Sequence, residues 1–245
     1  TMSRYGITLL SGGLDSTTVT TFARSEVDHL SAITFYYGQT HSKEVECAER
    51  IAKELDVDHR LLDISFLGEI AWYSALTNPE LFPLPKNRTE IGFGVPITYV
   101  PLRNTIFLSL AAALLESSIL KSIESEGEDP ERISASIFMA PNAIDYSGYP
   151  DCRPEFYEKA VDTLNEGCKI AAQYNIKFEI HTPIINMSKA DIAKLAQKIN
   201  APVHLTWSCY EGREVPCRSC DSCVLRAKGY EEAGLIDPLF ENLSK

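Results

Sequence analysis

Short apolar runs alternate with a segment of helical periodicity in the N-terminal part of the chain. Residues 5–10, 30–37 and 59–64 are apolar runs of strand length. Residues 42–55, between the second and third runs, carry apolar side chains at helical spacing. Strands that alternate with helices through short links favour a parallel sheet covered by helices on both faces.

The alternation continues in the second half of the chain. Residues 105–120 are apolar on nearly every side and predict a central helix. Ser188 and Asp191 have the spacing of a capping box at the start of a helix. Further elements are expected as strands over 132–139 and 177–182, and as helices over 155–174, 188–199 and up to about Ala233. We therefore predict an α/β fold with a doubly wound, mainly parallel sheet.

Two segments lack this periodicity. Residues 65–96 are rich in aromatic residues and proline, and are interpreted either as a lid or pocket wall, or as a surface loop packed on its own aromatics. Residues 121–132 are strongly charged and predict a solvated loop.

Composition limits the class of protein. The chain has 245 residues, 44% of them hydrophobic, which suits one α/β domain over 1–205 with a small appendage over 206–245. The net charge of −11 argues against a broad nucleic-acid-binding surface. We see no signal peptide and no uncharged apolar run long enough to cross a bilayer. An odd number of cysteines, 7, favours reduced thiols and a metal over disulfides, so we expect a cytoplasmic protein without a membrane partner.

The residues Ser-Gly-Gly-Leu-Asp-Ser at 11–16 lie between the first predicted strand and a helix. Adjacent glycines allow an anion to approach the backbone, and the helix start offers unpaired N–H groups with the positive end of its dipole. Asp15 repels phosphate, so we expect it to hold Mg²⁺ or to orient the loop. The alternative is a tight turn with Asp15 or Ser16 as N-cap. The candidates for nucleotide binding are Leu10, Ser11, Gly12, Gly13, Leu14, Asp15, Ser16, Thr17, Thr18 and Tyr36.

Other polar residues follow predicted strand ends, where parallel sheets bind ligands. Gln39, His41 and Glu44 follow the second strand, with turn chemistry and helix capping as the alternative. The candidates farther along are Arg103 and Asn104 at a helix start, Asp145, Tyr149, Asp151 and Arg153 in a turn-rich stretch, and Lys189 at another helix start. A surface ion pair for Arg103 and an exposed helix position for Lys189 remain the alternatives.

Cysteines cluster near the C-terminus. Cys209, Cys217, Cys220 and Cys223 have the number and spacing of a structural zinc site with four thiolate ligands. The alternatives are an iron–sulfur cluster and free or disulfide-bonded cysteines. Asp221 is a candidate cap of the last helix. Cys47 and Cys168 are interpreted as packing residues in helices, whereas Cys152 is either structural or reactive.

The loop at 11–16 resembles the pyrophosphate loop of the N-type ATP pyrophosphatases. Those enzymes cut ATP between its α and β phosphates, adenylate a substrate oxygen and let a nucleophile displace AMP. Nearly the whole chain is similar to the 7-cyano-7-deazaguanine synthases of queuosine and archaeosine precursor biosynthesis. The similarity rests on the loop, Tyr37-Gly38-Gln39, His41, Glu44, Val100-Pro101, Arg103-Asn104, residues 145–156, Thr206-Trp207-Ser208-Cys209 and the cysteine cluster with Gly234 and Asp237-Pro238. Two departures are Ala140-Pro141 in place of Gly-Val and Arg218 where glycine is common.

The resemblance implies an adenine-nucleotide hydrolase-like fold, a homodimer, and the substrates ATP, ammonia and 7-carboxy-7-deazaguanine. It also implies Mg²⁺ as a cofactor bound with ATP. It implies catalytic roles for Asp15, Ser16, Arg103 and Lys189, with Arg103, Arg153 and Lys189 as contacts to carboxylate or phosphate. Asp145, Tyr149 and Asp151 are expected at the base edge, and Gln39, His41, Glu44 and Asn104 elsewhere around the substrate. No glutaminase domain is apparent, so free ammonia is the expected nitrogen source.

Other functions remain open at this point. A tRNA thiolase of the same superfamily needs a reactive cysteine pair outside the metal site. Another ATP-dependent amidating ligase would share the loop. A zinc-bearing nucleic-acid-binding protein would bind RNA in a salt-sensitive way without using ATP.

Overall fold

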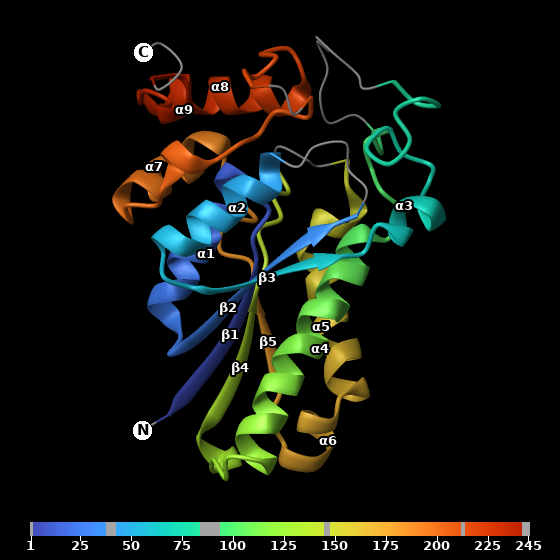
Figure 1. The fold of residues 1–245 in the computed structure, drawn as a ribbon, viewed down its shortest axis with the longest axis vertical. Coiled ribbons are helices and arrows are strands. Elements are labelled where there is room, and N and C mark those ends of the chain that lie inside the picture. The colour runs from blue at the N-terminus through green and yellow to red at the C-terminus, as the bar shows by residue number, and fades with distance from the viewer. Residues whose placement is uncertain (1, 38–42, 84–93, 145–147, 212–213, 242–245) are drawn as a thin grey trace.

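The computed structural model describes residues 2–37, 43–83, 94–144, 148–211 and 214–241 (Figure 1). A sheet of 5 parallel strands in the order β3-β2-β1-β4-β5 forms its centre. The strands lie close to the predicted ranges and are β1 (Ser3–Leu9), β2 (His29–Tyr36), β3 (Asp58–Asp63), β4 (Ile133–Phe138) and β5 (Phe178–His181). The strand order reverses at β1, so a crevice opens beyond the C-terminal ends of β1 and β4, where such sheets bind ligands.

Helices cover both faces of the sheet, which confirms the predicted fold class. In Figure 1, α4, α5 and α6 lie on one side, and α1, α2 and α7 on the other. The helices and short 3-10 turns are α1 (Leu14–Glu26), α2 (Lys43–Glu54), α3 (Phe66–Ile70), α4 (Arg103–Glu124), η1 (Pro130–Arg132), η2 (Pro150–Cys152), α5 (Pro154–Gly167), α6 (Lys169–Tyr174), α7 (Lys189–Lys198), η3 (Val203–Leu205), α8 (Asp221–Ala233) and α9 (Pro238–Glu241). Helices α8 and α9 lie across the end of the molecule toward which the strands run (Figure 1).

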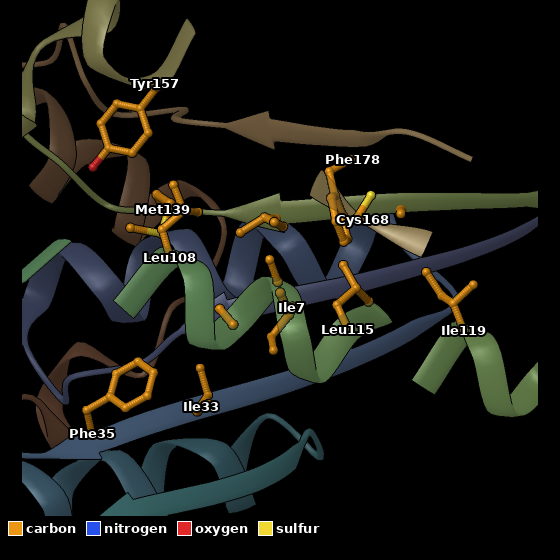
Figure 2. Packing of buried hydrophobic residues seen from close by; sticks show 14 of the residues in the cluster. Ile7, Ile33, Phe35, Leu108, Leu115, Ile119, Met139, Tyr157, Cys168 and Phe178 are labelled. Atoms are coloured by element: carbon orange, nitrogen blue, oxygen red, sulfur yellow. The ribbon is translucent and has the colours of Figure 1, made fainter. Parts of the chain in front are cut away.

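The largest apolar cluster lies between the sheet and helices α4 to α6 (Figure 2). Ile7 of β1 and Ile33 of β2 are fully buried against Leu108 and Ile119 of α4. Burial of each such side chain stabilises the fold by about 1.5–3 kcal/mol. This packing fixes the strand ends on which the loops of the site are mounted.

Helix α4 is the longest helix among the described residues and is long and apolar enough to cross a bilayer, by length and composition alone. The core helix of a soluble protein passes the same test. One face of α4 packs against the sheet through Leu108, Ala111, Leu115 and Ile119, which agrees with the central position predicted for it.

Several local predictions are wrong. The helix expected over 155–174 is broken at Cys168, whose extended backbone ends α5 and caps α6. The side chain of Asn165, just before that break, donates to the Phe178 carbonyl at 3.1 Å and accepts from the Phe178 amide at 2.8 Å. The charged segment 121–132 is not simply a solvated loop, because α4 runs on to Glu124 and Glu128 accepts a hydrogen bond from Tyr5 at 2.7 Å.

The capping predictions have mixed outcomes. Gly13, and neither Asp15 nor Ser16, is the N-cap of α1. Cys220 is the N-cap of α8, so Asp221 occupies the first helical position. The capping box of Ser188 and Asp191 is confirmed at the start of α7.

Candidate active site

The glycine loop joins β1 to α1 at the C-terminal end of the central strand. Gly12 has a φ of 87°, and a Cβ added there would lie 2.3 Å from the carbonyl oxygen of Glu44, so the position accepts no side chain. The Ser16 hydroxyl accepts from the Ser11 amide at 3.1 Å and lies 3.0 Å from the Ser11 hydroxyl. Because no side chain caps α1, its first N–H groups remain available to an anion.

The loop opens into a cavity of about 330 Å³, within the range of small-molecule sites. The cavity lies beyond the ends of β1, β2 and β4, and its walls include Phe35, Phe107 and Met139. Its lining residues from the predicted site are Leu10, Ser11, Gly13, Leu14, Asp15, Ser16, Glu44, Arg103, Asn104, Tyr149 and Lys189. The structure therefore brings together residues from five separate segments of the chain that the sequence suggested one by one.

The other predicted site residues lie elsewhere or outside the described residues. Gly12, Thr17, Thr18, Tyr36, Asp151 and Arg153 do not line the cavity. Thr18 bonds the carbonyl of Leu14 within α1, and the Arg153 side chain is exposed at the start of α5. Gln39, His41 and Asp145 fall outside the described ranges.

A buried ion pair joins the glycine loop to α7. Lys189 Nζ donates to both carboxylate oxygens of Asp15, at 2.8 Å and 2.7 Å, across 174 residues of sequence. Lys189 is only 8% exposed, because the capping box starts α7 with this side chain directed at the loop. The lysine is therefore neither an exposed helix residue nor an isolated cation, and its ammonium group lies at the glycine-loop end of the cavity.

A second cationic group enters the cavity at the start of α4. Arg103 donates to the Tyr37 hydroxyl at 3.3 Å, and its guanidinium lies 5.9 Å from the centre of the Tyr37 ring. Glu44 lies in the same wall, and burial raises its pKa to about 7 against the opposing influence of Arg103. Asp151 accepts hydrogen bonds from Asn104, and burial raises the pKa of its carboxyl group as well.

Cys152 lines the cavity as a buried thiol. Burial and the neighbouring charge of Asp151 raise the pKa of Cys152 to about 11. The sulfur is therefore almost entirely protonated at neutral pH and is a poor nucleophile.

Sequence reasoning missed several cavity residues. Tyr157 of α5 and Arg226 of α8 line the cavity, as do Ser208, Tyr210 and Ser222 of the C-terminal segment. The family resemblance included residues 206–209 but assigned no cavity role to them. Ala75 and Leu76 are also in the lining, so the irregular segment 65–96 supplies part of the wall, as one of the two interpretations expected. In the same segment Tyr73 packs on Phe82 with ring centres 4.7 Å apart. This contact agrees with the other interpretation, a loop packed on its own aromatic residues.

The four clustered cysteines form a candidate metal centre. The sulfur atoms of Cys209, Cys217, Cys220 and Cys223 all lie within 4.8 Å of one another. A tetrahedral zinc site with bonds of about 2.3 Å places its sulfurs about 3.8 Å apart, so the arrangement fits a zinc ion. Four thiolates leave no open coordination position, which favours a structural role.

Arg218, where the family commonly has glycine, lies inside this cysteine loop. Its φ is 60°, in the left-handed region that glycine adopts without strain. The guanidinium lies 4.8 Å from the centre of the Phe240 ring. The other departure, Ala140-Pro141, is part of the cavity lining.

The metal centre is tied to the glycine loop through the backbone. The Trp207 amide donates to the Gly12 carbonyl at 2.8 Å, only two positions before the ligand Cys209. Arg226 donates to the hydroxyls of Thr206 at 2.9 Å and Ser208 at 3.0 Å, and it pairs with Asp237 at 2.7 Å. The C-terminal segment therefore forms part of the cavity wall and also carries the candidate metal centre.

The chain is similar to known proteins over nearly its whole length. A protein from Thermoplasma volcanium called 7-cyano-7-deazaguanine synthase is 45% identical over 240 residues, which is 97% of this chain and 91% of that protein. A protein of the same name from Oceanobacillus iheyensis is 42% identical and covers 96% of this chain and 97% of its own length. The NMN synthetase structure from Francisella tularensis is 14% identical, with a TM-score of 0.44 over 98% of this chain and 78% of that one, a likeness too weak to support an inference.

The family model described as "Queuosine biosynthesis protein QueC" matches residues 5–234. The matched range contains the glycine loop, Arg103, Lys189 and all four clustered cysteines. On this match and on the relatives, the chain belongs to the queuosine biosynthesis protein QueC family.

Proposed function

We propose that this protein converts 7-carboxy-7-deazaguanine, ATP and ammonia into 7-cyano-7-deazaguanine, acting as an ATP-dependent carbon–nitrogen ligase. The proposal is supported by family membership and by relatives named 7-cyano-7-deazaguanine synthase. The observation that carries it is the glycine loop at the start of α1, which opens into the same cavity as Lys189 and Arg103. That arrangement suits a triphosphate at one end and an anionic acid beside it.

The chemistry requires two rounds of activation by ATP. The carboxylate oxygen of the acid attacks the α-phosphorus of ATP, and pyrophosphate leaves. Ammonia then adds to the acyl carbon, and AMP leaves with one of the original carboxylate oxygens, which gives the amide and a proton. A second ATP adenylates the amide oxygen with loss of pyrophosphate. Loss of AMP and the remaining N–H protons leaves the nitrile.

The protein's own groups supply positioning and charge compensation in this scheme. The amides at the start of α1 and the Lys189 ammonium receive the pyrophosphate, whose negative charge grows as the P–O bond breaks. Lys189 exchanges its partner Asp15 for phosphate in that step. Mg²⁺ carried with ATP would be held by Asp15 and would neutralise part of the phosphate charge. Arg103 receives the substrate carboxylate.

The test is an assay with purified protein, ATP, Mg²⁺, ammonia and 7-carboxy-7-deazaguanine. We expect AMP, pyrophosphate and the nitrile, with two AMP formed for each nitrile. Asp15→Ala is expected to abolish AMP release and to leave the zinc content unchanged. AMP formation by this variant at the wild-type rate would refute the role of Asp15.

Lys189→Ala tests whether the Lys189 ammonium group contacts phosphate directly or only adds to the overall positive charge of the protein. Loss of the cation at the loop is expected to lower AMP formation by about 100-fold or more, as loss of a preorganised charge contact does. Lys194→Ala is the matched control, because Lys194 is an exposed lysine one turn farther along the same helix. Equal activity of the two variants would contradict the assignment of Lys189.

The thiolase alternative has less support. It needs a reactive cysteine pair, whereas Cys152 has a pKa raised to about 11, and Cys47 and Cys168 are buried. Among the described residues these are the cysteines outside the metal cluster. The homodimer, the cytoplasmic location and the lack of a nucleic-acid partner stay predictions. Sedimentation analysis of the purified protein tests the dimer directly.

A further inference from the structure

Tyr157 is a buried polar residue that the proposed reaction does not yet use. It lies near the start of α5, is 5% exposed and forms part of the cavity wall. Figure 2 shows its ring at the edge of the core cluster near Met139, another wall residue. Tyr157 thus lies between the apolar core and the cavity, with its hydroxyl oxygen buried.

The Tyr157 hydroxyl has no hydrogen-bond partner among the described residues. The hydroxyls of other tyrosines in this wall are engaged, since Tyr149 lies 2.6 Å from Thr98 Oγ1 and Tyr37 accepts from Arg103. A buried hydroxyl without a partner destabilises a fold and is rare in native proteins. An unpartnered hydroxyl in a cavity wall is accounted for if a ligand supplies the missing partner.

The residues around Tyr157 indicate which chemical groups the ligand carries. Phe107 and Met139 give the wall flat, apolar surfaces suited to an aromatic ring system, and Arg103 provides the cation for an acidic group. Burial, together with the nearby Cys152 and Asp151, raises the pKa of Tyr157, so its hydroxyl keeps its proton and can donate. A hydrogen-bond acceptor on a ring system would complement that donor.

We propose that the Tyr157 hydroxyl is a specificity-determining contact that donates a hydrogen bond to a ring acceptor of the deazaguanine substrate, a ring carbonyl oxygen or a ring nitrogen. The inference rests on the proposed function. The substrate's carboxylate has to meet the α-phosphate of ATP, which leaves the ring acceptors for a hydroxyl elsewhere in the wall. ATP bound at the glycine loop is not the partner of Tyr157.

Tyr157→Phe removes this hydroxyl and keeps the ring. Calorimetric titration is expected to show affinity for 7-carboxy-7-deazaguanine reduced about five- to tenfold, the usual effect of one lost neutral hydrogen bond. Affinity for ATP is expected to be unchanged. The unfolding temperature should not fall, because no hydrogen bond within the protein is lost. In the steady state, KM for the acid should rise more than kcat falls.

Tyr174→Phe is the matched control. The Tyr174 hydroxyl donates to Glu124 at 2.7 Å on the outside of the molecule, and Tyr174 is not part of the cavity wall. This variant should bind both ligands as the wild type does, and its unfolding temperature should fall slightly.

Three results would overturn the inference. Unchanged affinity of Tyr157→Phe for the acid would show that the hydroxyl does not contact it. Reduced affinity for ATP with unchanged affinity for the acid would assign Tyr157 to the nucleotide. A lower unfolding temperature with both affinities unchanged would give Tyr157 a purely structural role. Failure of the proposed function is distinguishable, because the wild-type protein would then bind no acid and release no AMP with it.

Discussion

Gly229 of α8 lies against the side chain of Lys189 at the start of α7. A Cβ added to Gly229 would lie 2.4 Å from Cγ and 2.7 Å from Cβ of Lys189. The two helices therefore approach closely because residue 229 has no side chain. This approach holds the lysine stem on the path that carries its ammonium group to Asp15.

Gly229→Ala is expected to displace Lys189 from the glycine loop. A shift of about 1 Å at a positioning group costs on the order of 100-fold in rate, so AMP formation should fall by about ten- to hundredfold. Gly167→Ala is the control, because nothing lies within 4 Å of the Cβ it would add. The measurement is AMP release under saturating ATP. A folded Gly229→Ala protein with wild-type activity would contradict the positioning role.

Metal removal is expected to weaken nucleotide binding as well as the fold. The ligand Cys209 follows closely after Trp207, whose amide holds the Gly12 carbonyl at 2.8 Å. Without the ion the cysteine loop has little core of its own to keep that bond in place. We therefore expect chelation, or Cys220→Ser, to lower both the unfolding temperature and the affinity for ATP.

The control for metal removal is Cys168→Ser, which alters a buried cysteine outside the cavity wall. This variant should keep its metal content and its affinity for ATP, even where its unfolding temperature falls. Metal content by mass spectrometry and ATP affinity by titration are the readouts. Metal-free protein with wild-type ATP affinity would disprove the coupling.

Asp237→Ala is expected to lower the free energy of unfolding by about 3–5 kcal/mol, since it leaves a buried guanidinium without its carboxylate. The Arg226 and Asp237 side chains are 3% and 7% exposed, and two hydrogen bonds of 2.7 Å and 2.8 Å join them. Urea unfolding measures the change. Glu232→Ala, which removes an exposed partner of Lys228 at 3.7 Å on the same helix, should cost less than about 1 kcal/mol. Similar losses in both variants would mean that burial of the pair is unimportant.

Cys152 should react slowly with thiol reagents at neutral pH. With a pKa raised to about 11, its thiolate fraction at pH 8 is about one in a thousand. The rate of iodoacetamide labelling at Cys152 should therefore rise about tenfold per pH unit from pH 7 to pH 10. Peptide mass spectrometry on the zinc-loaded protein follows this site separately from the metal ligands. Labelling at pH 7 as fast as in unfolded protein would contradict the raised pKa.

Cys152→Ser should form the nitrile at close to the wild-type rate, because a protonated thiol takes no covalent part in the reaction. Complete loss of turnover in a normally folded variant would revive the thiolase hypothesis. A normal rate would leave Cys152 as a packing residue of the cavity wall.

Local patterns were enough to predict much of the fold and part of the site. Strands β1, β2, β4 and β5 and the central helix α4 follow from their apolar patterns, because each of them buries side chains in the core. Strand β3 was also predicted from its apolar residues, although its side chains are at most half-buried. The capping box at Ser188 depends only on neighbouring residues, as does the turn made possible by Gly12. The cysteine spacing likewise predicted a cluster that the structure brings together.

The break at Cys168 could not be read from periodicity, because hydrogen bonds from Asn165 to the distant Phe178 stabilise it. Tyr157, Arg226 and Gly229 escaped prediction for the same reason. The role of each depends on partners or on space that other elements supply. Most strands and helices, the glycine loop and the cysteine cluster could be predicted from local residue patterns, because each depends mainly on neighbouring residues. The contact of Lys189 with Asp15 and the closure of the cavity by the C-terminal segment could not, because they join residues far apart in the chain and depend on how the helices pack.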